Sequence, residues 1–312
     1  MEVWILLTED QSGRLLNLAG AFILGYAGMV SADQIDDCLE RGWIVVALEH
    51  RLCPQVDIFE GPVADCRDAL EWVYSGGLDK ELHAHQDSST YAVDDDRVVA
   101  FGTSSGGLLA LALGFSVKRP VAAVLDLYGA TNFRDAFWSK PLPSIKPPDC
   151  PREFINEVYQ ERPVPIRGGV SLEGQANDDK PPPLQPRAAF ALTHIANGTL
   201  MDVCFPSKEW KKIDATLNVT EKFPPTCIVH GIDDVMVPIF LSKALFRALQ
   251  DAGAKSEFIE VPDEGHTFVG KMKKGFRTWD LQRKGFDFLE HVIGTSDTHI
   301  KNTTAYWRYR NL

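Results

Sequence analysis

The sequence lacks a long apolar run, an excess of basic charge and any pair of cysteines at metal or redox spacing. No stretch approaches the roughly 18 apolar residues that a membrane-spanning helix needs. Lys and Arg number 32 against 43 Asp and Glu, so the net charge is −11. Nucleic acids and anionic membranes are bound by basic faces. We therefore expect neither a membrane span nor a nucleic-acid partner.

The cysteines are few and scattered, and several lie inside apolar patterns, where a reduced cysteine behaves as a small hydrophobic residue. The six are Cys38, Cys53, Cys66, Cys150, Cys204 and Cys227. The apolar opening, residues 1–7, has no basic flank and is too short for a signal peptide. We predict free thiols in a cytoplasmic protein, with no metal and no cofactor.

Apolar residues make up 45% of the 312 residues and charged residues 24%, which is typical of a globular chain with a sizeable core. Apolar runs alternate with amphipathic stretches along most of the chain. We predict strands at residues 41–51, 97–101, 121–127, 226–230 and 257–261, and helices at 63–74, 108–115, 239–250 and 281–293. Such alternation indicates an α/β fold, in which helices flank a mostly parallel central sheet.

Residues 131–215 interrupt this alternation with proline clusters at 146–148, 163–165 and 181–183. A disordered insertion is one reading of such a segment. Its aromatic residues favour a folded one; they include Phe137, Trp138, Phe154, Phe190 and Trp210. We predict an inserted cap of loops and short helices over residues 131–215. Residues 1–130 and 216–312 then form the core, and the whole is a single structural domain.

A serine lies between a predicted strand and a predicted helix, in residues 102–106 (G-T-S-S-G). On a sharp strand-to-helix turn a serine points outward and its neighbours must be small, which Gly102 and Gly106 satisfy. The amino end of the helix then directs its N–H groups and positive dipole end at the reacting centre. The alternative is a small-residue turn without chemistry. The pattern makes Ser104 a candidate nucleophile.

A nucleophilic serine needs a base, and the base needs an acid that orients it. Asp233 and Asp234 follow the predicted strand 226–230, and His266 follows the strand 257–261. The order serine, acid, histidine along the chain, each after a strand, is that of the α/β-hydrolase arrangement. We predict that Ser104, an aspartate of this pair and His266 form a catalytic triad.

With these motifs the chain resembles the hormone-sensitive-lipase-like esterase branch of the α/β-hydrolase superfamily. The G-x-S-x-G-G elbow is residues 102–107, and residues 50–54 (H-R-L-C-P) correspond to the branch's Y-R-L-A-P segment. The acid motif G-x-x-D-x-x-V-P matches residues 231–238, and G-H-x-F matches residues 265–268. The resemblance implies an α/β-hydrolase fold and selects Asp234 over Asp233 as the acid.

Two features depart from that branch. Its oxyanion loop, H-G-G-G-[FW], corresponds only to residues 18–22 (L-A-G-A-F), and seventeen residues precede it where the branch has several tens. Backbone N–H groups are the donors of an oxyanion hole, so alanine can still supply one. We predict an oxyanion hole from Gly20, Ala21 and Ser105, on a fold with a shortened N-terminus.

The resemblance implies a serine hydrolase that cleaves carboxylic esters or lactones of small molecules through an acyl-serine intermediate. A dehydratase or a condensing or cyclising enzyme of a specialised-metabolite pathway remains an alternative, because the loop at residues 18–21 is similar to that of fungal pathway-specific members. A non-catalytic binder similar to the plant gibberellin receptor is a second alternative, against which the retained His266 counts. A peptidase is less favoured, since no propeller or other gating domain is present. Substrate identity and oligomeric state stay open.

Overall fold

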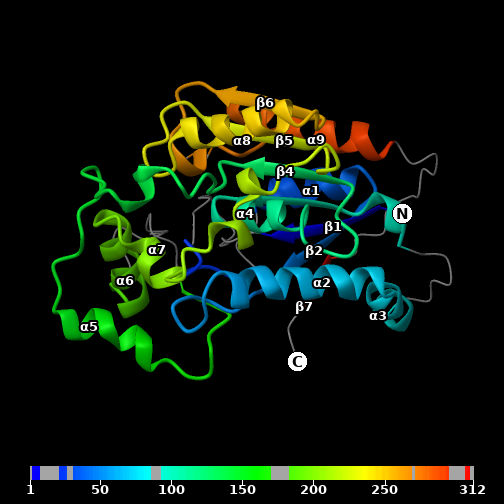
Figure 1. The fold of residues 1–312 in the computed structure, drawn as a ribbon. Coiled ribbons are helices and arrows are strands. Elements are labelled where there is room, and N and C mark those ends of the chain that lie inside the picture. The colour runs from blue at the N-terminus through cyan, green and yellow to red at the C-terminus, as the bar shows by residue number, and fades with distance from the viewer. Residues whose placement is uncertain are drawn as a thin grey trace.

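The computed structural model describes residues 2–7, 21–26, 31–85, 93–169, 183–268, 271–294 and 306–309. Seven strands form one sheet (Figure 1). They are β1 (Glu2–Leu7), β2 (Trp43–Leu48), β3 (Val99–Thr103), β4 (Ala123–Leu127), β5 (Thr226–Gly231), β6 (Ser256–Val261) and β7 (Tyr306–Tyr309).

The strand order is β6-β5-β4-β3-β1-β2-β7, and every pair among the described residues is parallel. The registers bring strand ends together, with Thr103 of β3 opposite Leu127 of β4. In the same way, Val229 of β5 is paired with Leu127. Parallel strands bring their carboxyl ends to one edge of the sheet, where ligand sites of open α/β folds lie.

Helices cover both faces of the sheet. They are α1 (Ala32–Glu40), α2 (Ala64–Tyr74), α3 (Gly77–His85), α4 (Ser105–Ala112), α5 (Arg152–Asn156), α6 (Pro186–Ala196), α7 (Leu200–Cys204), α8 (Ile239–Asp251) and α9 (Arg277–Ile293). Residues of α1 and α9 pack on one face. Residues of α2, α3, α4 and α8 pack on the other.

Strand β2 shows why the sheet needs both helical layers. All six of its side chains are buried. Val45 joins the cluster on the α1 and α9 face, whereas Ile44 and Val46 join the cluster on the opposite face. Successive side chains of a strand point to opposite faces, so a continuous apolar run requires cover on both sides.

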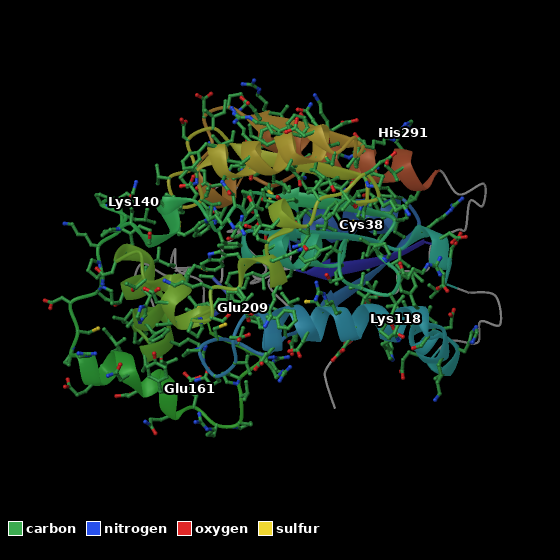
Figure 2. The ribbon with its side chains drawn as sticks, in the orientation of Figure 1. Cys38, Lys118, Lys140, Glu161, Glu209 and His291 are labelled. Atoms are coloured by element: carbon green, nitrogen blue, oxygen red, sulfur yellow. The ribbon has the colours of Figure 1, made fainter. Side chains whose placement is uncertain are left out.

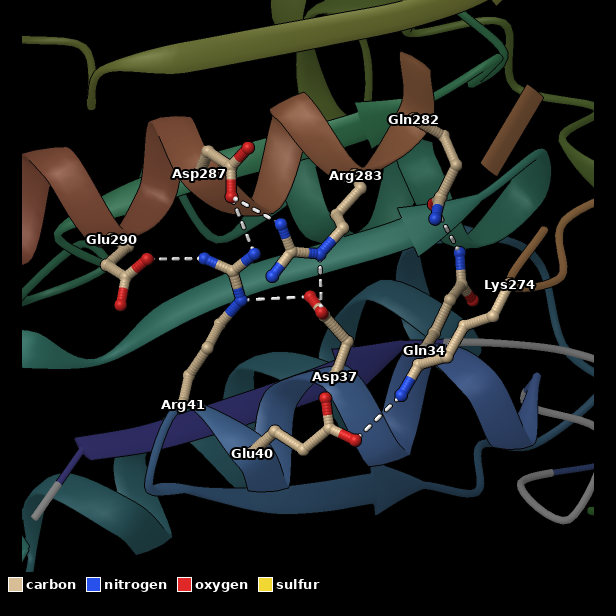
Figure 3. A network of polar contacts seen from close by, with 9 residues as sticks. All are labelled: Gln34, Asp37, Glu40, Arg41, Lys274, Gln282, Arg283, Asp287 and Glu290. Atoms are coloured by element: carbon tan, nitrogen blue, oxygen red, sulfur yellow. Dashed lines mark hydrogen bonds and ion pairs between the residues drawn. The ribbon is translucent and has the colours of Figure 1, made fainter. Parts of the chain in front are cut away.

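The face formed by α1 and α9 is also held by a polar network (Figure 3). Arg41, directly after α1, bonds Asp37 of that helix at 2.9 Å and reaches Asp287 of α9 at 2.6 Å. Arg283 of α9 bonds the same Asp37 at 2.7 Å. Because the Asp37 side chain is 1% exposed, removing either guanidinium leaves a buried carboxylate with fewer partners, which is costly.

Between β4 and β5 the chain leaves the sheet and crosses the carboxyl ends of the strands (Figure 1). This part contains α5, α6 and α7 and four single turns. The turns are η4 (Ala136–Ser139), η5 (Glu157–Gln160), η6 (Trp210–Lys212) and η7 (Ala215–Leu217). Within residues 131–169 and 183–215 no strand forms. Figure 2 places Lys140, Glu161 and Glu209 on this segment. Its predicted role as a cap, and the domain boundaries, stay predictions.

The predicted α/β-hydrolase architecture is confirmed, and each predicted strand and helix has an observed counterpart. Other elements were not predicted. Residues 2–7 form β1, which lies between β2 and β3 near the middle of the sheet. Residues 15–20, which include the start of the loop predicted to form the oxyanion hole, lie outside the described residues. The basic-aromatic segment at residues 306–309 is strand β7, paired with β2.

Candidate active site

Ser104 lies on the turn from β3 into α4, with φ 54° and ψ −119°. A positive φ is costly for a residue with a side chain and persists where the surrounding structure enforces it. Gly107 allows the helix to approach the sheet this closely. A Cβ at that position would lie 2.7 Å from the Cα of Gly129 and would collide with the Asp126 carboxyl group. The sequence thus forces Ser104 outward by packing small residues beneath it.

Asp234 and His266 lie on two loops that follow the neighbouring strands β5 and β6. The loops are joined by backbone hydrogen bonds. The N–H of Asp233 donates to the carbonyl of Glu264 at 3.0 Å, and the N–H of Ile232 donates to that of Val261 at 3.0 Å. His266 opens the single turn η8 (His266–Phe268). These bonds fix the distance between the acid loop and the histidine loop.

The structure brings Ser104, His266 and Asp234 together. Ser104 Oγ lies 2.9 Å from His266 Nε2, and His266 Nδ1 lies 2.7 Å from Asp234 Oδ2. The three residues are 4%, 5% and 4% exposed, respectively. A carboxylate only accepts, so Nδ1 carries the proton and Nε2 is left to accept from the serine hydroxyl. This is the tautomer that a general base needs.

The charge of Asp234 is stabilised by its partners against its burial. Burial alone would raise the pKa of Asp234. The neighbouring His266 and the hydrogen bond from His230 outweigh burial and hold that pKa below its usual range. The backbone N–H groups of Met236 and Val237 also donate to Oδ1, both at 2.9 Å. The group is therefore an ionised acceptor at neutral pH.

The other aspartates near these loops are placed differently. Asp233 and Asp263 are both exposed. The geometry thus brings Asp234, the residue selected by the motif, to His266. His230, which no sequence pattern marked as functional, lies 3.2 Å from Asp234 Oδ2.

Two of the three residues predicted to form the oxyanion hole, Ala21 and Ser105, lie in the part of the chain that the structure describes. Ser105 opens α4 and lines the pocket beside Ser104. Ala21 lines the same pocket and has φ 49°, and Phe22 after it has φ 65°. Gly20 lies outside the described residues. Ala21 and Ser105 both line the pocket that contains Ser104, and their role as oxyanion donors stays a prediction.

The loop at residues 21–26 is anchored by an arginine that sequence analysis did not single out. Arg187 of α6, 5% exposed, donates to the carbonyl of Ile23 at 2.8 Å and to that of Cys53 at 2.6 Å. It also pairs with Glu161 at 2.6 Å. The N–H of Cys53, within the H-R-L-C-P segment, donates to the carbonyl of Phe22 at 2.9 Å. These bonds rigidify a loop that lacks the histidine of the branch it resembles.

A pocket opens above Ser104 and His266, with about 600 Å³ of space when the part open to solvent is counted. The segment between β4 and β5 supplies one wall, which includes Phe137, Trp138, Leu142, Ile195, Leu200 and Met201. The lining is apolar apart from Ser104, Ser105, Lys140 and His266. Phe190, by contrast, is fully buried beside His194 and Tyr159 and does not line the pocket.

A second buried carboxyl group lies in β4, below the elbow. Asp126 is 0% exposed; its Oδ1 accepts from the N–H of Gly129 at 2.8 Å, and its Oδ2 has no hydrogen-bond partner among the described residues. Burial raises the pKa of Asp126 to about 7, although the bond from Gly129 lowers it. No sequence motif marks Asp126, because it lies inside an apolar strand pattern.

Within the described part of the chain, no group of three or more His, Cys, Asp or Glu could hold a metal ion. No described helix is long and apolar enough to cross a membrane. No disulfide joins the six cysteines, five of which are buried.

Comparison with known proteins supports the fold. A family model described as BD-FAE matches residues 20–164, and one described as the prolyl oligopeptidase family matches residues 195–296. Each spans less than half of the chain. Both differ from the hormone-sensitive-lipase-like branch that the motifs indicate, so that branch stays a prediction.

Curated relatives are fungal polyketide synthases. The chain is 27% identical over 271 residues to the non-reducing polyketide synthase Preu6 of Preussia isomera, covering 80% of this chain and 12% of that protein. It is 29% identical over 320 residues to the non-reducing polyketide synthase prhL of Penicillium brasilianum, covering 89% of this chain and 12% of that protein. The chain thus spans a small fraction of these relatives' length.

Solved structures of similar shape include esterases. A thermophilic esterase from Thermogutta terrifontis, with propionate bound, has a TM-score of 0.54 at 16% identity and covers 95% of this chain and 85% of its own. An acetyl ester-xyloside bifunctional hydrolase from Caldicellulosiruptor lactoaceticus has a TM-score of 0.52 at 16% identity, covering 94% and 83%. The protein has the α/β-hydrolase fold.

Proposed function

We propose that the protein is a serine hydrolase that cleaves carboxylic esters, thioesters or lactones through an acyl-serine intermediate. One observation carries the proposal: Ser104 Oγ, His266 and Asp234 are joined by contacts of 2.9 and 2.7 Å at the base of a pocket. A serine hydroxyl is a weak nucleophile until a neighbouring base takes its proton. The geometry supports Ser104 as nucleophile, His266 as base and Asp234 as orienting acid.

In the first half-reaction, Ser104 Oγ attacks the substrate carbonyl carbon and its proton passes to His266 Nε2. Asp234 stabilises the imidazolium without taking its proton. The carbonyl oxygen becomes an oxyanion, for which the N–H groups of Ser105 and of the loop at Gly20 and Ala21 are the proposed donors. The bond to the leaving oxygen or sulfur then breaks, and His266 returns the proton to that atom.

In the second half-reaction, a water molecule attacks the acyl group on Ser104 while His266 Nε2 takes a proton from it. The same oxyanion donors act again. Collapse of the tetrahedral intermediate releases the carboxylic acid, and the proton returns to Ser104 Oγ. Ser104 and His266 thus act in both half-reactions, and water is the co-substrate of the second.

The relatives favour an acyl chain of the polyketide type as the substrate. Such a chain carries several carbonyl groups on a largely apolar skeleton, which matches a pocket lined by Phe137, Trp138 and Met201 with few polar groups. Among the described lining residues, Lys140 alone carries a permanent charge. We propose that the substrate is a ketide-derived ester or thioester and not a short simple ester.

A second candidate is condensation or cyclisation, in which a carbon or oxygen nucleophile of the acyl chain itself attacks the acyl-serine. The apolar lining favours this outcome, because a pocket filled by the acyl chain leaves little room for water. The first half-reaction is the same. The products differ: hydrolysis gives the free acid, and internal attack gives a ring.

The test is turnover of a diketide thioester of N-acetylcysteamine alongside 4-nitrophenyl butyrate. Wild-type protein should release the thiol from the first and 4-nitrophenol from the second, and Ser104→Ala should release neither. Mass spectrometry of the thioester products then separates acid from ring. Equal turnover by wild type and Ser104→Ala contradicts the proposal.

A further inference from the structure

A second histidine contacts the acid of the candidate triad. His230 lies in β5 and is 0% exposed. Its Nε2 lies 2.7 Å from the carbonyl oxygen of Val237 and 3.2 Å from Asp234 Oδ2. Its Nδ1 lies 2.9 Å from the hydroxyl of Ser242 in α8, which is also 0% exposed.

The contacts of His230 define where its proton lies. A carbonyl and a carboxylate both accept, so Nε2 must carry a hydrogen to satisfy either of them. Ser242 Oγ can donate to an unprotonated Nδ1. In a neutral ring the one Nε2–H is shared between the Val237 carbonyl at 2.7 Å and Asp234 Oδ2 at 3.2 Å, and Nδ1 accepts from Ser242, so no charge has to be buried.

The bonds to Asp234 fill its acceptor sites. A carboxylate offers about four lone-pair positions, two on each oxygen. Oδ1 accepts from the N–H groups of Met236 and Val237. Oδ2 faces two imidazole rings, His266 at 2.7 Å and His230 at 3.2 Å. His230 thus completes the set of donors that holds this carboxylate in one orientation.

We propose that His230 is a positioning residue that fixes Asp234 and limits how strongly the carboxylate attracts the proton of His266. This inference rests on the proposed function. By donating to the same oxygen as His266, His230 shares the negative charge. Without it, that charge would act on His266 alone and would favour the imidazolium, which cannot serve as the base.

The other groups near His266 are neutral, paired elsewhere or exposed, so Asp234 and His230 are the main influence on the protonation of His266. Ser104 faces Nε2. Tyr128, at the end of β4, places its ring 5.1 Å from the imidazole. The carboxyl group of Glu264 is held by Lys271 at 3.0 Å and Thr278 at 2.6 Å. Asp263 and Asp233 are exposed to solvent.

The first experiment compares His230→Asn with His230→Gln. A glutamine amide reaches close to the Nε2 position and can still donate to Asp234, whereas the shorter asparagine cannot. The acid limb of kcat/KM for 4-nitrophenyl butyrate, measured from pH 5 to 9, should move up by about 0.5–1 pH unit in the asparagine variant. In the glutamine variant the acid limb should lie close to its wild-type pH. KM should change little in both variants.

A purely structural role predicts another result, namely equal losses of melting temperature in both variants and an acid limb at the wild-type pH. That result overturns the proposal. The second experiment needs neither turnover nor a variant: nitrogen-15 NMR of the histidine rings in the wild-type protein. It should find His230 neutral, with its proton on Nε2. A proton on Nδ1, alone or on a charged ring, contradicts the proposal whether or not the protein hydrolyses esters.

Discussion

Two neighbouring strands, β4 and β5, each bring one carboxyl group into the buried floor of the site, and the two groups behave in opposite ways. Asp234, just after β5, accepts from two histidines and two backbone N–H groups. Asp126, inside β4, accepts one backbone N–H, and in the part of the chain that the structure describes its Oδ2 has no partner. Both are buried, so the difference shows that partners rather than burial decide which aspartate carries charge.

The two groups also link stability to pH with opposite signs. The pKa of Asp126 is raised to about 7, so its protonated form is favoured in the folded state. Stability from this group is full below the unfolded value of about 3.9 and is lost as pH rises toward about 7. Asp234 has a lowered pKa, so its contribution is present above about pH 3.9 and is lost as pH falls through its folded value.

The largest expected effect separates the two acids by activity. Asp234→Asn should lower kcat on the order of 10⁴, because an amide opposite His266 Nδ1 favours the wrong tautomer. Asp126→Asn should retain most activity, since Asp126 touches no reacting group. Steady-state kinetics on 4-nitrophenyl butyrate checks both, with the exposed Asp233→Asn as the matched control. A crippled Asp233→Asn beside an active Asp234→Asn would reverse the assignment.

The second effect distinguishes Asp126 from Asp234 by how protein stability depends on pH. Between pH 5 and pH 8, wild-type protein should lose about 3 kcal/mol of unfolding free energy through Asp126, a loss that Asp126→Asn should not show. Urea unfolding at the two pH values measures the difference. If wild type and Asp126→Asn have parallel pH profiles, Asp126 is ionised in the folded protein and the comparison fails.

A third change tests the packing that encloses Asp126. Gly107→Ala places a Cβ against the Asp126 carboxyl and the Gly129 backbone, so it should destabilise the fold by about 1–3 kcal/mol. Thermal unfolding measures this loss. Ala112→Gly in the same helix is the comparison, because it removes a buried methyl group and some helix propensity without adding an atom near Asp126, and it should cost about 1–2 kcal/mol. An unchanged melting temperature in Gly107→Ala would mean that the elbow is looser than the structure has it.

The smallest expected effect is a change in substrate preference. It concerns the segment after β4, which supplies a pocket wall, whereas the segment after β5 supplies Asp234. Trp138 is half-buried, lines the pocket and donates its indole N–H to the carbonyl of Thr131 at 3.0 Å. Trp138→Phe should shift the kcat/KM ratio between hexanoate and acetate esters by about 3–10-fold, roughly what one or two methylenes are worth. Phe190→Leu, away from the pocket, should lower the melting temperature and leave this ratio unchanged. A shift in the ratio for Phe190→Leu but not for Trp138→Phe would contradict this division.

The sequence predicts this fold well where a feature depends on the residues of one short segment. Continuous apolar runs marked β2 and β5, and small residues around Ser104 marked the elbow. Asp234 and His266 follow from motifs that keep their spacing in the chain. These features are local, so the sequence contains them directly.

The features that the sequence did not reveal are tertiary. Strand β1 reads as a short apolar opening, and only its pairing with β2 and β3 makes it central. Arg187 meets Ile23 across 164 positions of the chain, and His230 has meaning only once β5 and its loop bring it to Asp234. Phe190 and Trp138 look equivalent as aromatics of one segment, yet only packing separates a core residue from a pocket residue.

The most direct test of the account is covalent labelling with a fluorophosphonate, read by intact mass and peptide mapping. The account predicts one adduct per chain, on Ser104, formed in wild type and in Ser105→Ala, which keeps its backbone N–H, and absent in Ser104→Ala. Labelling should be strongly slowed in Asp234→Asn. An adduct that forms at the wild-type rate in Ser104→Ala, or no adduct on folded wild-type protein, would contradict the assignment of Ser104 as an activated nucleophile.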